Sequence, residues 1–169
     1  MGRDKALITL DGRTLIERAL DRLQAHVSEL MVIGDPGRYG HIVPSVFADV
    51  VTGKGPLGGI VTAMRFSSND KLLVLACDMP GINDALLDLL KLNLGNFTDA
   101  VVPEHGKRIE PLCAAYHRRC ASLFNAALQG DRLKMSSVLE EVRVHRLPIG
   151  PGAGWPEDLF RNVNAPDDL

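Results

Sequence analysis

The chain has 169 residues, of which 46% are hydrophobic and 24% charged, a composition typical of one globular domain and not of a disordered segment. A net charge of −2, 5% aromatic residues and apolar runs far shorter than the roughly 20 residues of a membrane span argue against nucleic-acid and membrane partners. Three cysteines without a CxxC pair, and no secretory leader, predict a cytoplasmic protein with a single domain over residues 1–169.

Helix-like and strand-like patterns alternate along the chain. The first helix is expected to begin at Leu15 with Thr14 as its N-cap, and KLLVLAC reads as a strand buried on both faces. Helices are predicted at 15–27, 59–66, 84–92, 118–128 and 134–142, and strands at 30–34, 45–50, 71–77, 98–103, 109–116, 142–147 and 159–164. This order predicts a three-layer, Rossmann-like α/β fold with a mostly parallel sheet.

Asp78 directly follows the most hydrophobic strand, in the stretch LLVLACDMPGI. Ligands of open α/β sheets bind beyond the carboxyl ends of the strands, and a carboxylate there suits Mg²⁺ shared with substrate phosphates. The alternative is that Asp78 only caps the next turn or helix. Position alone favours neither interpretation.

A glycine-rich stretch, FADVVTGKGPLGGI, places Asp49 at the end of a strand and Gly55 and Gly59 shortly after it. Glycines let a backbone approach a ligand closely, and the following helix offers free N–H groups. Lys54 is followed by glycine and not by Ser or Thr, so the P-loop pattern is absent. Taken alone, such a cluster is more often a simple turn.

Two asparagines, Asn162 and Asn164, lie in the C-terminal stretch FRNVNAPDDL. On a strand, residues two apart share a face, and paired amides can bind a heterocycle edge or a ribose. The same residues also fit a turn and a helix start, so both interpretations stay open.

The stretches MGRDKAL, GPLGGI, ACDMP, IEPLCAAY and FRNVNAPDDL resemble, in order and approximate spacing, the MobA family of molybdenum cofactor guanylyltransferases. The resemblance implies transfer of GMP from GTP to molybdenum-bound molybdopterin, with Mg²⁺ and release of pyrophosphate. It also implies contacts with molybdenum cofactor biosynthesis proteins and with recipient molybdoenzymes.

The resemblance further assigns roles to single residues. It makes Lys5 a catalytic contact to the GTP phosphates and Asp78 the catalytic metal ligand. It places Gly2, Asp49, Gly55 and Gly59 at the nucleotide, and Asn162 and Asn164 on the pterin side. Gly34 stands where many members of the family have an asparagine, which implies that a side-chain contact to guanine is missing.

The sequence departs from the family at its start. The family has a first strand and a glycine-rich LAGGxSxR stretch before the segment that corresponds to MGRDK, and the printed chain contains neither. We expect this to leave the neighbouring strands with unpaired edges and an open core. A chain that began at Met1 should be poorly stable and catalytically weak, so we expect an internal methionine start or an N-terminal deletion.

Three other functions fit the same residues. One is the related cytidylyltransferase. A transfer assay that compares GTP with CTP would distinguish it from the guanylyltransferase. Another is a non-catalytic binding protein of the same fold, which the missing loop favours and which the presence of Lys5, Asp49 and Asp78 opposes. A weaker alternative is a sugar-nucleotide or phospholactate nucleotidyltransferase.

Overall fold

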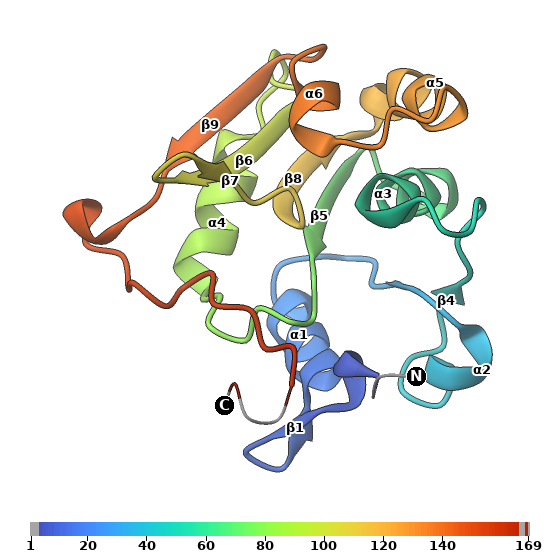
Figure 1. Cartoon of the computed structure of the whole chain (residues 1–169), viewed down its shortest axis with the longest axis vertical. Helices are drawn as coiled ribbons and strands as arrows, with labels where there is room; N and C mark the ends of the chain where they lie inside the picture. The colour runs from blue at the N-terminus through green and yellow to red at the C-terminus, as the bar shows by residue number, and fades with distance from the viewer. Residues whose placement is uncertain (1–3, 166–167, 169) are drawn as a thin grey trace.

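A sheet of five strands lies between helices on both of its faces in the computed structural model, which describes residues 4–165 and 168 (Figure 1). The helices are η1 (Lys5–Leu7), α1 (Leu15–Gln24), α2 (Pro36–Tyr39), α3 (Gly55–Phe66), α4 (Asp84–Asn93), η2 (Arg118–Cys120), α5 (Ala121–Gln129), α6 (Met135–Leu139) and η3 (Pro151–Ala153). The strands are β1 (Thr9–Leu10), β2 (Arg13–Thr14), β3 (Val32–Ile33), β4 (Val46–Phe47), β5 (Lys71–Leu75), β6 (Ala100–His105), β7 (Arg108–Ile109), β8 (Cys113–His117) and β9 (Val144–Pro148).

Strands β5, β6 and β9 run in the same direction in this sheet, whose order is β5-β8-β6-β7 with β9 beside β6. Strand β8 lies antiparallel between β5 and β6. Strand β8 pairs with all five residues of β5 and also pairs with β6, so it joins β5 to β6 in one sheet. The predicted α/β class is confirmed, and β8 and the short β7 run antiparallel to β5, β6 and β9, a direction that the sequence pattern does not predict.

Alternate side chains of the sheet strands enter two separate cores. On β8, Ala114 and Tyr116 pack with α3, α5 and α6 on one face, whereas Cys113 and Ala115 pack with α4 on the other. This alternation is the one that a pleated strand imposes, and it produces the three layers predicted from the sequence. The apolar positions of the helices therefore cover both faces, as the continuous apolar run of β5 indicates.

Strands β3 and β4 form a separate two-stranded parallel sheet. In the part of the chain that the structure describes, β3 pairs only with β4, and β5 pairs only with β8. The expectation of unpaired edges and an open core is confirmed, because a cavity of about 940 Å³ is lined by both strands.

Local sequence signals explain several element boundaries. Helix α1 begins at a capping box, in which Glu17 N–H donates to the Thr14 hydroxyl and the Glu17 carboxylate accepts from the Thr14 N–H. Helix α3 begins at Gly55, so the expected loop is helical through GPLGG, with Pro56 in its first turn. No helix among the described residues is long and apolar enough to cross a membrane.

The predicted strand at 159–164 is wrong. These residues form a turn followed by irregular chain, although Val163 is buried and its N–H donates to the backbone oxygen of Asp78 at 2.8 Å. The Asp168 carboxylate accepts hydrogen bonds from the N–H groups of Asn164 and Ala165, at 2.7 and 2.9 Å. A side chain therefore satisfies backbone donors that a strand would have paired within a sheet.

Candidate active site

The structure brings Lys5, Asp78 and Asn164 together from three distant parts of the chain. The Lys5 ammonium donates to the Asn164 Oδ1 at 2.7 Å and lies 3.5 Å from the Asp78 Oδ2. Lys5 is in η1, Asp78 follows β5, and Asn164 belongs to the C-terminal segment. Their convergence confirms that these three residues share a neighbourhood, while their roles stay predictions.

Asp78 is held at the end of β5 with its carboxylate partly accessible, the side chain being 23% exposed. Helix α4 takes its N-cap from Asn83, whose side chain accepts from the Leu86 N–H. Asp78 therefore does not cap α4, and this alternative for its role is excluded. The backbone oxygen of Asp78 accepts a hydrogen bond from the Val163 N–H, and the Asp78 carboxylate faces Lys5. This carboxylate is therefore available to bind a ligand in the site.

Asp4, Arg38 and Tyr39 form a second polar group beside Lys5. The Asp4 Oδ2 accepts from the Tyr39 hydroxyl at 2.7 Å and from the Arg38 guanidinium at 2.9 Å, while its Oδ1 accepts from the Ala6 N–H. Burial raises the pKa of Asp4, but these hydrogen bonds outweigh it and hold the pKa below its usual value of 3.8. Burial, and then the bond to Asp4, raise the pKa of Tyr39 to about 12. This carboxylate fixes η1 against α2 and so positions Lys5.

Arg38 and Tyr39 were not identified by the sequence reasoning. Both lie in the one-turn helix α2, in a stretch where the sequence pattern predicts no helix or strand. The sequence signal that points to them is Asp4, beside Lys5, because a partly buried carboxylate needs hydrogen-bond donors from other parts of the chain.

Asp49 faces the beginning of α3. Its Oδ1 is buried without a hydrogen-bond partner among the described residues, which is an uncommon and costly condition for a carboxylate. A Cβ added at Gly58 or Gly59 would lie 3.9 Å from this oxygen, in ordinary van der Waals contact, so the first turns of α3 lie beside Asp49. Gly55 has a φ of +59°, which a residue with a side chain rarely adopts, and it permits the turn into the helix.

The predicted residues do not all share one surface. Lys5, Asp49, Gly59 and Asp78 line the same cavity, together with Asp4 and Tyr39, at what we call its polar end. Gly55 is next to the lining residue Pro56. Asn164 reaches the site through Lys5, whereas Asn162 is exposed and is not among the lining residues. Gly2 lies outside the described residues.

Gly34 has a packing role that the resemblance does not imply. A Cβ at this position would lie 2.8 Å from Cε2 of Tyr39, closer than real Cβ contacts. The Tyr39 ring therefore occupies the place where a longer side chain would stand. The absence of a side chain at Gly34 thus leaves room for the ring of Tyr39, which lines the polar end of the cavity.

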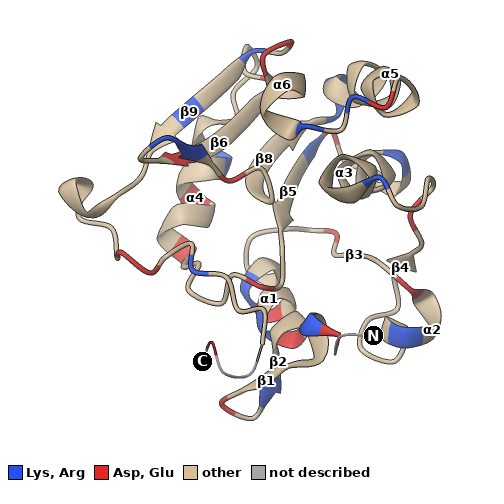
Figure 2. Cartoon of the chain, in the orientation of Figure 1, with Lys and Arg blue, Asp and Glu red and all other residues tan. Residues whose placement is uncertain are grey.

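Charged residues of both signs are interspersed over the helices and strands, so the site does not depend on a field of one sign (Figure 2). Lys54, at the start of α3, forms an ion pair with Asp131 at 2.7 Å and is not a free cation beside the glycines. Among the described residues, Asp78 forms an ion pair with Lys5, at 3.5 Å.

The carboxylates of the site suit a magnesium ion that takes its other ligands from substrate and water. No three His, Cys, Asp or Glu side chains within 4–165 and 168 come together as a ready metal cluster. Magnesium, however, is usually held by one or two carboxylates together with substrate phosphates and water. Asp78 is partly accessible and Asp49 has a carboxylate oxygen without a partner, so these two side chains suit that kind of site.

A three-layer α/β fold with a lysine and carboxylates around a cavity beyond the strand ends is typical of enzymes that bind nucleotides and transfer phosphate-linked groups, a class that includes the nucleotidyltransferases. The family profile described as the MobA-like NTP transferase domain matches residues 1–146. The chain belongs to this family.

Curated relatives match over nearly the whole chain. A probable molybdenum cofactor guanylyltransferase of Methanothermobacter thermautotrophicus is 33% identical, over 100% of this chain and 90% of that protein. One of Bacillus licheniformis is also 33% identical, over 99% of this chain and 87% of its own length. Among solved structures, molybdopterin-guanine dinucleotide biosynthesis protein A of Archaeoglobus fulgidus has a TM-score of 0.81 at 26% identity, with 99% and 87% of the two chains covered.

Proposed function

We propose that this chain is a Mg²⁺-dependent guanylyltransferase that joins GMP from GTP to the phosphate of molybdenum-bound molybdopterin and releases pyrophosphate. The observation that carries the proposal is the convergence of Lys5, Asp78 and Asn164 at the polar end of the cavity. The relatives named as guanylyltransferases support the choice of the guanine nucleotide.

The chemistry asks the protein for positioning and charge neutralisation more than for a covalent nucleophile. In the proposal, the Lys5 ammonium offsets negative charge on the triphosphate, and Asp4, through Tyr39 and Arg38, keeps η1 in place. Asp78 would hold the metal, with Asp49 nearby on the same cavity. A Mg²⁺ held there would supply positive charge that offsets the negative charge of the substrate phosphates.

Asn164 is proposed to lie on the pterin side, where its contact to Lys5 would connect the two halves of the substrate pair. We extend the same role to Asn162, which is exposed and free to approach a second substrate. The attacking oxygen would belong to the phosphate of the molybdenum-bound molybdopterin. A cytoplasmic location, and contacts with other biosynthesis proteins and recipient molybdoenzymes, remain predictions that this function implies.

The decisive experiment replaces Asp78 with alanine and measures GMP transfer and, by calorimetry, binding of GTP with Mg²⁺. Removal of a group that stabilises charge in a transition state costs about a hundredfold to a thousandfold in rate, so Asp78→Ala should lose nearly all transfer. Lys5→Met should lose about a hundredfold, because it removes one charge while it keeps the length of the side chain.

A matched control lies at the other end of the same strand. Asp70 is exposed and precedes β5, so Asp70→Ala should leave transfer and GTP binding unchanged. Full activity of Asp78→Ala would refute the assignment of Asp78. A folded wild-type chain that binds no GTP with Mg²⁺ would instead favour a non-catalytic protein, and faster transfer from CTP than from GTP would favour the cytidylyltransferase.

A further inference from the structure

The C-terminal segment, residues 158–164, contains no helix or strand, yet it reaches the polar end of the cavity (Figure 1). It carries Asn164, whose Oδ1 accepts a hydrogen bond from the Lys5 ammonium at 2.7 Å. A segment without the hydrogen bonds of a helix or sheet keeps its place only through contacts with the rest of the molecule. These contacts therefore decide where Asn164 stands relative to Asp78.

Two apolar side chains attach the segment to the cores of the molecule. Leu159 is buried in the core on the α4 face of the sheet, and Val163 is buried in a cluster with Ile8 and Leu15. The Val163 N–H also donates to the backbone oxygen of Asp78 at 2.8 Å. The three residues between these two attachments are exposed or half-buried, so their placement depends on other contacts.

The loop that follows Asp78 lies very close to the beginning of the segment. A Cβ added at Gly81 would lie 3.0 Å from the backbone oxygen of Asp158 and 3.1 Å from that of Leu159, tighter than ordinary contacts of a Cβ. Glycine at this position therefore lets the two backbones approach one another. A residue with a side chain there would push the segment away from the loop.

A stacked pair of rings holds the middle of the segment. The imidazole of His105, at the end of β6, stacks on the ring of Phe160, with ring centroids 4.7 Å apart and planes inclined by 17°. The His105 Nε2 lies 2.6 Å from Oε1 of Glu110, and it donates the hydrogen because a carboxylate only accepts. A bond of this kind fixes the orientation of an imidazole ring. Glu110 therefore determines the plane on which Phe160 rests.

Glu110 belongs to the stretch IEPLCAAY, which lies between the ends of β5 and β6. The Glu110 N–H donates to the Pro103 oxygen at 3.0 Å, and the Leu112 oxygen accepts from the Ala76 N–H at 2.7 Å. Backbone bonds to both strands thus hold the turn that carries the carboxylate. It lies at the carboxyl ends of β5 and β6, the edge beyond which ligands of α/β sheets bind.

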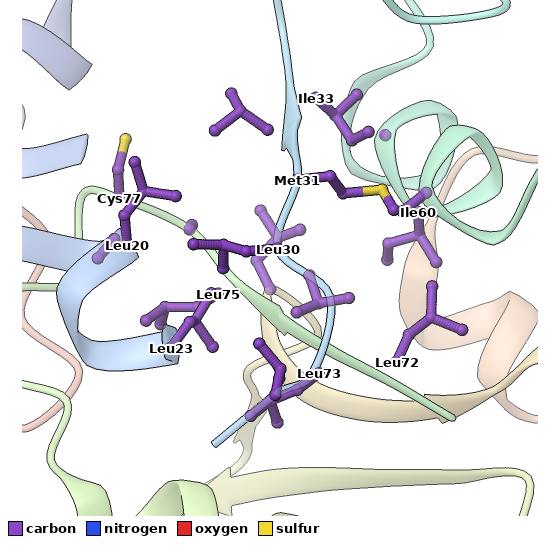
Figure 3. Close-up of a pocket in the computed structure, with 18 of the residues that line it drawn as sticks. Leu20, Leu23, Leu30, Met31, Ile33, Ile60, Leu72, Leu73, Leu75 and Cys77 are labelled. Atoms are coloured by element: carbon purple, nitrogen blue, oxygen red, sulfur yellow. The ribbon is translucent and has the colours of Figure 1, made fainter. Parts of the chain in front are cut away.

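The cavity wall on the β5 side of the polar end is apolar, since Leu75 and Cys77 line it there (Figure 3). These side chains offer a polar second substrate no strong hydrogen bonds. The contacts that the described residues can offer it beside Asp78 therefore come from η1, from α2 and from the C-terminal segment. On that segment Asn162 and Asn164 are exposed, so its placement bears directly on how such a substrate binds.

We propose that Glu110 and His105 are positioning residues, which act through Phe160 and hold the C-terminal segment in place for the molybdopterin substrate. This inference rests on the proposed function, because that function supplies the substrate that the segment would meet. Neither residue touches the substrate. Lys5 keeps its ion pair with Asp78 when the segment loosens, so binding of GTP does not depend on the two positioning residues.

Hydrogen exchange of the full chain tests the positioning without any substrate. Loss of an aromatic contact corresponds to about a threefold to tenfold change in an equilibrium constant, so His105→Ala should speed exchange of the Val163 amide by that factor. The amides of β6 should be unchanged. Glu110→Ala should share the effect, whereas Glu110→Gln, whose amide oxygen still accepts, should not. His145→Ala, at an exposed position of β9, is the matched control and should change nothing.

Kinetics of GMP transfer test which substrate the segment serves. His105→Ala should raise the KM for molybdenum-bound molybdopterin by a similar factor and leave the KM for GTP unchanged, because only one substrate loses a contact. Gly81→Ala, which displaces the segment from the other side, should give the same difference between the two KM values. Gly95→Ala is its control, because a Cβ there would meet nothing within 4 Å.

Two results overturn the inference. One is exchange of the Val163 amide that is equally fast in His105→Ala and in His145→Ala, and the other is a rise in the KM for GTP as large as that for the molybdopterin substrate. A wild-type chain that transfers no GMP overturns the proposed function and, with it, the substrate named here. Faster Val163 exchange in His105→Ala would then still support the positioning of the segment, so the two failures are distinguishable.

Discussion

The two halves of the molecule are stabilised very differently. In the half built on β5, β6, β8 and β9, neighbouring strands pair over as many as five residues, and both faces carry buried cores. In the half built on β3 and β4, each strand is two residues long, and β3 lines the cavity. The proposed active site lies where the two halves meet.

The difference is one of redundancy. In the first half, Asp99 alone connects three elements, because its carboxylate accepts from Arg119 and from both the side chain and the N–H of Arg143. In the second half, Asp4 holds α2 against η1 through two donors, Tyr39 and Arg38, and β3 pairs with β4 over only two residues. The site therefore combines a fixed component, Asp78 just after β5, with a component that small changes can displace.

The largest effect on stability is expected from a substitution in the half built on β5, β6, β8 and β9. Asp99 is buried, and the bonds from Arg143 hold its pKa far below the usual range against the effect of burial. Asp99→Asn should lower the free energy of unfolding by about 2 kcal/mol, a fall of roughly 4–8 °C in the thermal midpoint for a chain of this size. Asp70→Asn is the control, and urea unfolding is the measurement. A change below about 0.5 kcal/mol would show that Asp99 does not stabilise this half.

A smaller and local effect is expected in the open half. Gly34→Ala places a Cβ against the Tyr39 ring, and the overcrowding should cost about 1 kcal/mol, with faster hydrogen exchange in β3 and α2 but not in β6. Gly95→Ala is the matched control, because a Cβ there would meet nothing within 4 Å. Equal acceleration of exchange in β6 would contradict the separation into two halves.

The smallest effect is expected from acid. The folded pKa of Asp4 is below its ordinary value of 3.8, so its contribution to stability is present above that value and is lost as the pH falls through the folded pKa. The pKa of Asp99 is lowered much further, by Arg143, so α2 should loosen from η1 at a pH where the large sheet is still intact. An amide titration by NMR should show Gly37 to Tyr39 changing first, and Asp4→Asn should abolish that early step. Simultaneous change in both halves would contradict it.

Local signals predicted much of the fold and part of the site. The Thr14 cap, the buried strand before Asp78 and the N-terminal lysine each depend on residues close together in the chain. The contact between Tyr39 and Asp4, 35 residues apart, has no local signature, and neither does the junction of Asp99 with Arg143. The strand predicted at 159–164 failed for the same reason. Apolar residues are present there, but the backbone partner of the buried Val163 is the oxygen of Asp78, far away in the sequence.

The bond between Lys5 and Asn164 has a practical consequence for anyone who handles this chain. It joins residues 159 positions apart, so the first and the last described parts of the chain meet at the site. Residues fused shortly before Lys5 or shortly after Asn164 are consequently attached close to the reaction centre, where they compete with incoming molecules. The exposed turn at 151–154 offers an alternative insertion point.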